Sequence, residues 1–146
     1  MRGAGLGLAA VALLVAAAPG AAAGELVDPF EVIAVFDRFA AMEIWPGFDA
    51  AGKPIAIFDG ERTLLLRHPA PPEGFTLLAD HEGVWAWTGR HPAMRWNSNA
   101  EIGGRTTATL LLAIEPGRAV EREASILLHE PFHVWSKPRH PTWRPN

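Results

Sequence analysis

Cysteine is absent from this chain, and its absence excludes two kinds of site. None of the 146 residues can form a disulfide bond or offer a thiolate to a metal ion. Any zinc ion bound here must therefore be held by histidine and carboxylate side chains, the other common zinc ligands. A domain of this length does not need disulfides if its hydrophobic core is large enough.

An excess of positive charge and a long apolar run are also missing. Lys and Arg number 13 against 16 Asp and Glu, which gives a net charge of −3 at pH 7 with neutral histidines. No basic patch is evident, so the composition argues against a nucleic-acid partner. The apolar run over residues 6–18 is shorter than the ~20 residues that a membrane-spanning helix needs.

The N-terminus has the three parts of a secretory signal peptide. A basic residue, Arg2, precedes the apolar run, and Ala21–Ala23 offers a cleavage site of small residues. We predict removal of residues 1–23, export of the remainder as a periplasmic or secreted protein, and no stable membrane span afterwards. Loss of Arg2 brings the net charge to about −4. The alternative is an uncleaved N-terminal anchor.

Residues 24–146 are expected to form a single α+β domain with an N-terminal helix, an antiparallel or mixed sheet and a C-terminal helix. Asp28 and Pro29 are typical of a helix start, and Asp59-Gly60 between two apolar stretches predicts a hairpin. The polar, glycine-rich residues 89–104 indicate a loop. The predicted helices cover residues 29–43 and 118–136, and the predicted strands cover residues 54–58, 63–67, 75–79, 84–88 and 106–114.

Two tryptophans in the expected strand over residues 84–88 are a first candidate for a ligand platform. Trp85 and Trp87 alternate with Ala86, so both rings should face one side of the strand. We expect these rings to pack in the core or at an interface.

The motif that carries chemistry is His129-Glu130-Pro131-Phe132-His133, an HExxH sequence on the expected final helix. Side chains at positions i and i+4 of a helix point the same way, so His129 and His133 can hold one Zn²⁺ ion. Glu130 can then act as the general base toward a water molecule on that metal. The pattern favours a zinc-dependent peptidase.

At these residues the chain resembles the zincin metallopeptidases, of the gluzincin-like kind. The resemblance covers residues 124–135, which look like the active-site helix of that superfamily. It implies that His129 and His133 are zinc ligands, that Glu130 is the general base, and that the substrate is a peptide or protein. It also implies that the strand over residues 106–114 is the sheet edge that pairs with an extended substrate.

Two features depart from the zincin pattern. Proline inside a helix costs ~3 kcal/mol or introduces a kink, and Pro131 lies between the two histidines. Gluzincins take their third zinc ligand, a glutamate, from a later helix, whereas no Asp or Glu follows Glu130. We therefore expect a domain that is incomplete at its C-terminus, binds zinc weakly and cleaves peptides poorly.

Other histidines are weaker candidates for the third ligand. His68, His81 and His91 are expected in loops, where histidines are mostly solvated. Two functions stay open. The first is an exported zinc metallopeptidase-like protein, in a truncated or inactive form if no third ligand is supplied. The second is a non-catalytic exported domain with a degenerate or coincidental HExxH, which binds a partner through its tryptophan-rich surface.

Overall fold

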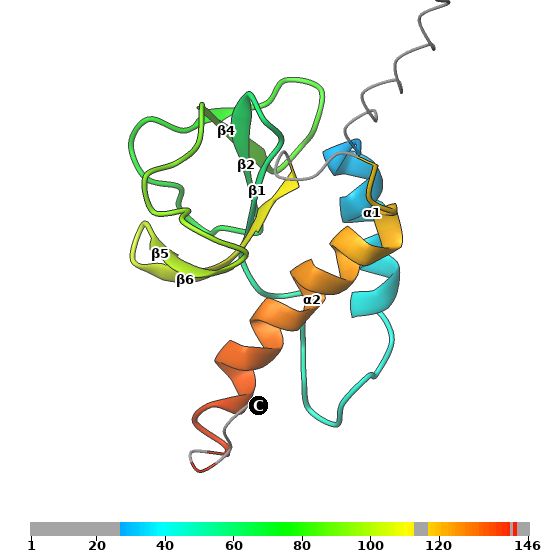
Figure 1. Cartoon of the computed structure of the whole chain (residues 1–146). Coiled ribbons are helices and arrows are strands. Elements are labelled where there is room, and N and C mark those ends of the chain that lie inside the picture. The colour runs from blue at the N-terminus through cyan, green and yellow to red at the C-terminus, as the bar shows by residue number, and fades with distance from the viewer. Residues whose placement is uncertain (1–26, 113–116, 141, 143–146) are drawn as a thin grey trace, which may run out of the picture.

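The computed structural model describes residues 27–112, 117–140 and 142, so the predicted signal peptide lies outside the described residues. The α+β fold class is confirmed, because an N-terminal and a C-terminal helix accompany a six-stranded mixed sheet (Figure 1). The elements are α1 (Pro29–Ala40), β1 (Ile55–Phe58), β2 (Arg62–Leu66), β3 (Thr76–Leu77), β4 (Val84–Thr88), β5 (Ser98–Ile102), β6 (Arg105–Leu111) and α2 (Val120–Ser136).

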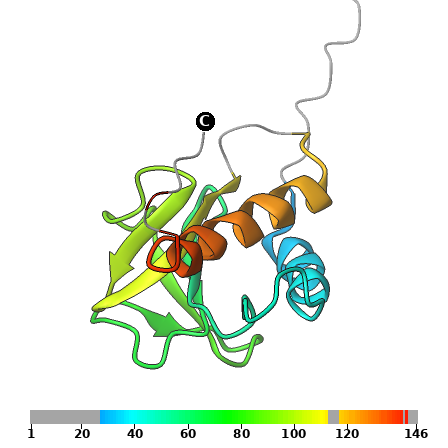
Figure 2. The same ribbon diagram turned by 90° about the horizontal axis from the view of Figure 1, so that it is seen from below.

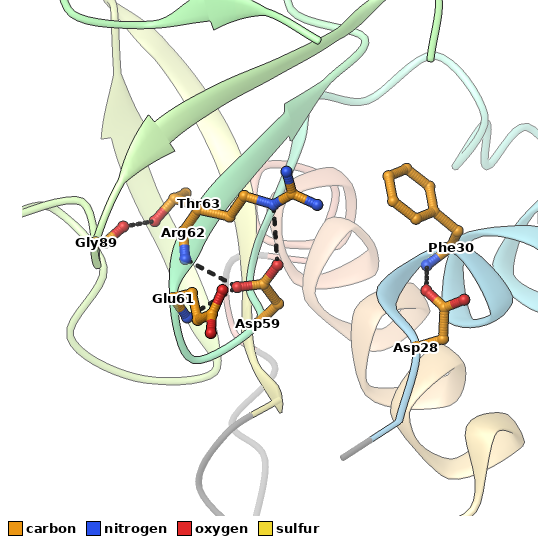
Figure 3. A network of polar contacts seen from close by, with 7 residues as sticks. All are labelled: Asp28, Phe30, Asp59, Glu61, Arg62, Thr63 and Gly89. Carbon is orange, nitrogen blue, oxygen red and sulfur yellow. Dashed lines mark hydrogen bonds and ion pairs between the residues drawn. The ribbon is translucent and has the colours of Figure 1, made fainter. Parts of the chain in front are cut away.

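Helix α1 begins where the sequence predicts. The Asp28 side chain accepts a hydrogen bond of 2.9 Å from the Phe30 backbone N–H (Figure 3). Pro29 occupies the first turn. These contacts stabilise the helix start, where backbone N–H groups lack partners within the helix. The helix ends at Ala40, three residues before the predicted end at residue 43. Its buried side chains are Val32, Ile33, Val35 and Phe36.

The β1–β2 hairpin turns at Asp59-Gly60, as the sequence predicts. The Asp59 carboxylate accepts hydrogen bonds from the backbone N–H groups of Glu61 and Arg62 at 2.9 and 2.8 Å, and from Arg62 Nε at 3.2 Å (Figure 3). Gly60 has a φ of 107°, a conformation that side chains other than glycine rarely adopt. The turn fixes the register of β1 against β2, with Ile57 opposite Leu64.

The strands lie in the order β3-β4-β2-β1-β6-β5. Among the strand pairs of the described residues, β1–β6 is parallel and the other four are antiparallel. Strand β1 is therefore central and reads as a continuous apolar run, Ile55–Phe58, which is typical of a strand buried on both faces. Strands β3 and β5 form the two edges of the sheet.

Both helices pack on one face of this sheet, and loops cover the other face (Figure 2). On the helix side, α2 contacts α1, β6 and β5. Alternation along β1 divides its side chains between the two cores, with Ile55 and Ile57 toward the helices and Ala56 toward the loops. Trp85 and Trp87 both pack, partly buried, against the loop-side core, as their alternation predicts.

Strand β5 corrects the prediction of a loop over residues 89–104. It pairs with β6 through the Gly103-Gly104 turn, where both glycines have positive φ angles of 55° and 70°. Two residues of positive φ match the right-handed twist of a hairpin, and this turn was the signal that the polar composition obscured. Because β5 lies outside β6, the expectation that residues 106–114 form the sheet edge is wrong.

Two further differences from the prediction concern the lengths of strands. The predicted strand over residues 75–79 shortens to β3, Thr76–Leu77, and part of the strand predicted over residues 106–114 lies outside the described residues. Among the described residues, neither helix has the length and apolar character needed to cross a membrane.

Candidate functional site

The HExxH motif lies in the C-terminal half of α2, and its histidines avoid the core. The buried residues of α2 include Ala124, Leu127, Pro131 and Trp135, which recur every three or four positions. Ala124 and Leu127 belong to the core between the helices and the sheet, and Trp135 packs against Phe48. His129 is exposed and His133 is half-buried. Because of the helical period, the buried side chains lie on one side of α2 and the two imidazoles lie on another.

The two imidazoles are in direct contact. Nε2 of His133 and Nε2 of His129 lie 2.7 Å apart, and the rings meet edge to face with 4.2 Å between their centroids. At this distance the two nitrogens share one proton, so at least one of them carries none. Burial lowers the pKa of His133 from its ordinary value, and the positive charges of His129 and Lys137 lower it further. Neutral imidazole is the form that binds metals.

Pro131 does not interrupt the helix that carries this pair. Helix α2 continues from Val120 to Ser136 with Pro131 inside it. The proline is buried, and it lines a cavity of only about 10 Å³ with Asn99 and Ala108 from the neighbouring strands. The proline thus does not separate the histidines, and its packing against β5 and β6 partly offsets the cost of the missing N–H.

Glu130, between the two histidines in the helix, meets strand β5. The Asn99 side-chain Nδ2 donates to the Glu130 backbone carbonyl at 3.2 Å and to Glu130 Oε2 at 3.4 Å. Burial raises the pKa of Glu130 from its ordinary value, and the nearby charges of His129 and Lys137 oppose this shift. A carboxyl with a raised pKa is better matched to general-base chemistry near neutral pH.

No third ligand joins the pair within residues 27–112, 117–140 and 142, because no group of three or more histidine, aspartate and glutamate side chains could hold a metal ion there. His68 is buried rather than solvated, contrary to the prediction. Its Nδ1 accepts from the Ala70 N–H at 3.2 Å and its Nε2 donates to the Ile102 carbonyl at 2.9 Å. Both ring nitrogens are thus engaged within the fold.

The other two loop histidines also have structural contacts. His81 stacks on Phe30 with 3.6 Å between ring centroids. His91 packs edge-on against Trp87 at 5.0 Å, and burial lowers its pKa. Among the residues that the structure describes, neither His81 nor His91 forms a group with His129 and His133 that could hold a metal ion.

The sequence reading missed an apolar groove on the His129 side of α2. Trp45 and Phe48, from the connection between α1 and β1, contact the Phe132 ring at centroid distances of 5.7 and 5.4 Å. Two hollows of about 300 Å³ each flank these rings. One hollow reaches His129, and the other extends toward Ser136 and His140. The two aromatic residues shortly after the first helix, Trp45 and Phe48, were the signal available in the sequence.

Comparisons with protein-family models, with curated proteins and with solved structures found no match to this chain. The functional assignment therefore rests on the residues and their geometry.

Proposed function

We propose that this protein is an exported zinc metallopeptidase-like protein whose site is built on α2. The convergence of His129 and His133, with their Nε2 atoms 2.7 Å apart, carries the proposal. Two imidazoles this close on one helix are a donor set that suits Zn²⁺, once the shared proton is lost and the nitrogens move apart to the roughly 3.3 Å that two tetrahedral Zn–N bonds require. Glu130, the next residue after His129 in the helix, supplies a carboxylate whose pKa is raised by burial.

In the proposed division of work, His129 and His133 would hold Zn²⁺. When bound, that ion would polarise a substrate carbonyl and acidify water. Glu130 would accept a proton on its carboxylate and later return it to the leaving amine. The lowered pKa of His133 keeps this ligand neutral at physiological pH, so proton competition for the metal is reduced.

Strand β5 is the proposed platform for the substrate. It forms one edge of the sheet, so one side of its backbone has no strand partner among the residues that the structure describes, and it contacts α2 near the motif. An extended peptide can add to such an edge through main-chain hydrogen bonds. This role moves from residues 106–114, where the sequence reading placed it, to Ser98–Ile102.

The proposal also requires a third protein ligand. Catalytic zinc sites use three protein ligands and keep one position open. His129 and His133 provide two, and the described residues bring no third acidic or histidine side chain to them. We propose that another segment or another chain supplies the third ligand in the active form, and that the pair alone binds zinc weakly.

A second candidate function is a non-catalytic exported domain that binds a partner. The exposed apolar side chains of Ile44 and Trp45 favour it, because they border the apolar groove beside α2. Such a patch is typical of a protein or ligand contact. In this case zinc and Glu130 would have no part in binding.

Zinc-dependent peptide cleavage separates the two candidates. Fluorogenic peptides should be cleaved slowly by the wild-type chain with zinc, and the Glu130→Gln variant should lose this cleavage while it keeps zinc. Chelation should abolish activity in the wild type, and the exposed Glu121→Gln change in the same helix should not affect it. Partner binding that survives both chelation and Glu130→Gln, without any cleavage, would favour the binding domain.

A further inference from the structure

Asn99 connects the edge strand to the motif. It is the second residue of β5, opposite Ala108 of β6, and its side chain faces the helix layer. The C-terminal half of α2 passes the β5–β6 hairpin at this point (Figure 2). The Asn99 Nδ2 group donates both to the backbone carbonyl and to the carboxylate of Glu130. One amide therefore restrains the main chain and the side chain of the same residue.

The oxygen atom of the Asn99 amide lowers the stability of the fold. This atom, Oδ1, is buried and has no hydrogen-bond partner among the described residues. A buried acceptor without a partner destabilises a fold, and an apolar side chain of similar shape would avoid the loss. A role in stability alone does not explain an asparagine at this position, whereas a role in orienting Glu130 does.

We infer that Asn99 is a positioning residue, which holds the Glu130 carboxylate against β5 so that the base and the strand that would receive the peptide keep a fixed geometry. This inference rests on the proposed function, because Glu130 acts as a base only in that reaction. Asn99 itself touches neither the reacting atoms nor the metal pair. It acts through Glu130, and it ties the position of the base to the strand on which a peptide would lie.

The kinetic test uses the nearly isosteric Asn99→Asp change together with Asn99→Ala. Asn99→Asp keeps the shape but loses the donor, so kcat should fall roughly ten- to hundredfold, the loss expected for a misplaced catalytic group. KM should stay within about twofold, because ground-state binding is not changed. Asn99→Ala should show the same split with an unchanged or raised thermal midpoint, since the unpaired Oδ1 is removed. Glu121→Gln, at an exposed position of α2, is the control.

A double variant separates positioning from general damage. If Asn99 acts through Glu130, then Asn99→Ala added to Glu130→Gln should cause no further loss of kcat. A full additional loss would overturn the inference. So would Asn99→Asp and Asn99→Ala variants that retain kcat, because the pairing would then not orient the base.

A second measurement needs no peptidase activity. In ¹⁵N-labelled protein, the side-chain amide protons of Asn99 should exchange slowly with solvent, and Glu130→Gln should shift their signals. Asn97, whose Oδ1 accepts from the Leu111 N–H at 2.7 Å, provides an internal control that should not respond. Fast exchange and no response at Asn99 would overturn the inference. A wild type that neither binds zinc nor cleaves peptides, but still shows the Asn99 response, would overturn the proposed function and leave the pairing supported.

Discussion

Replacing the proline within the motif tests how the fold keeps the two histidines together. In the Pro131→Ala variant, α2 gains an amide N–H for the Leu127 carbonyl and loses the ring that clashes with that turn. Proline in a helix interior costs ~3 kcal/mol relative to alanine. The change also removes two buried ring carbons from the contact with β5 and β6, at about 0.8 kcal/mol each. The variant should therefore be more stable by about 1 kcal/mol.

A gain of this size raises the thermal midpoint by about 4 °C for a domain of this length. Circular dichroism during heating and urea unfolding would both detect it. Zinc affinity should stay within about threefold of the wild type, because Nε2 of His129 and Nε2 of His133 already lie 2.7 Å apart with the proline in place.

Two results would refute this reasoning. A loss of more than about 1 kcal/mol would show that ring packing at Pro131 exceeds the helix penalty. A tenfold or greater increase in zinc affinity would show that the proline holds the histidines apart, as the sequence alone suggested, and that the convergence is absent in solution.

Three further predictions concern ionisation, the first helix and export. Burial raises the pKa of Glu130, so the native state binds more protons than the unfolded state, and the free energy of unfolding falls as the pH rises above about 4.3. The Glu130→Gln variant should therefore be more stable than the wild type at neutral pH but not in acid. Urea unfolding at both pH values would show this. Asp28→Ala should lower the free energy of unfolding by about 1 kcal/mol through loss of the cap at Phe30, whereas Asp28→Ser should retain most of it. Mass spectrometry of exported protein should find an N-terminus near Gly24, and an intact N-terminus in the cytoplasm would contradict export.

Local signals in the sequence predicted the elements whose hydrogen bonds are local. The Asp28-Pro29 helix start and the Asp59-Gly60 hairpin each depend on contacts between residues a few positions apart, and both are present. The helical period also predicts that residues i and i+4 share a face, and His129 and His133 meet as that period requires.

Features that depend on distant residues could not be predicted in this way. Strand β5 is polar and follows a loop, so only its pairing with β6 makes it a strand, and that pairing also moves the sheet edge outward. The Asn99–Glu130 contact joins residues 31 positions apart, and no periodicity indicates it. Pro131 was expected to disturb the helix because its packing partners on β5 and β6 are not visible in the sequence.

The central claim is that His129 and His133 form a zinc-binding pair, and calorimetric zinc titration tests it most directly. The wild-type chain should bind one zinc ion weakly, and His129→Ala and His133→Ala should each abolish that binding. His140→Ala, which changes a histidine beyond the end of α2, should leave it intact. Absence of zinc binding in the wild type, or unchanged binding in both His129→Ala and His133→Ala, would contradict the account.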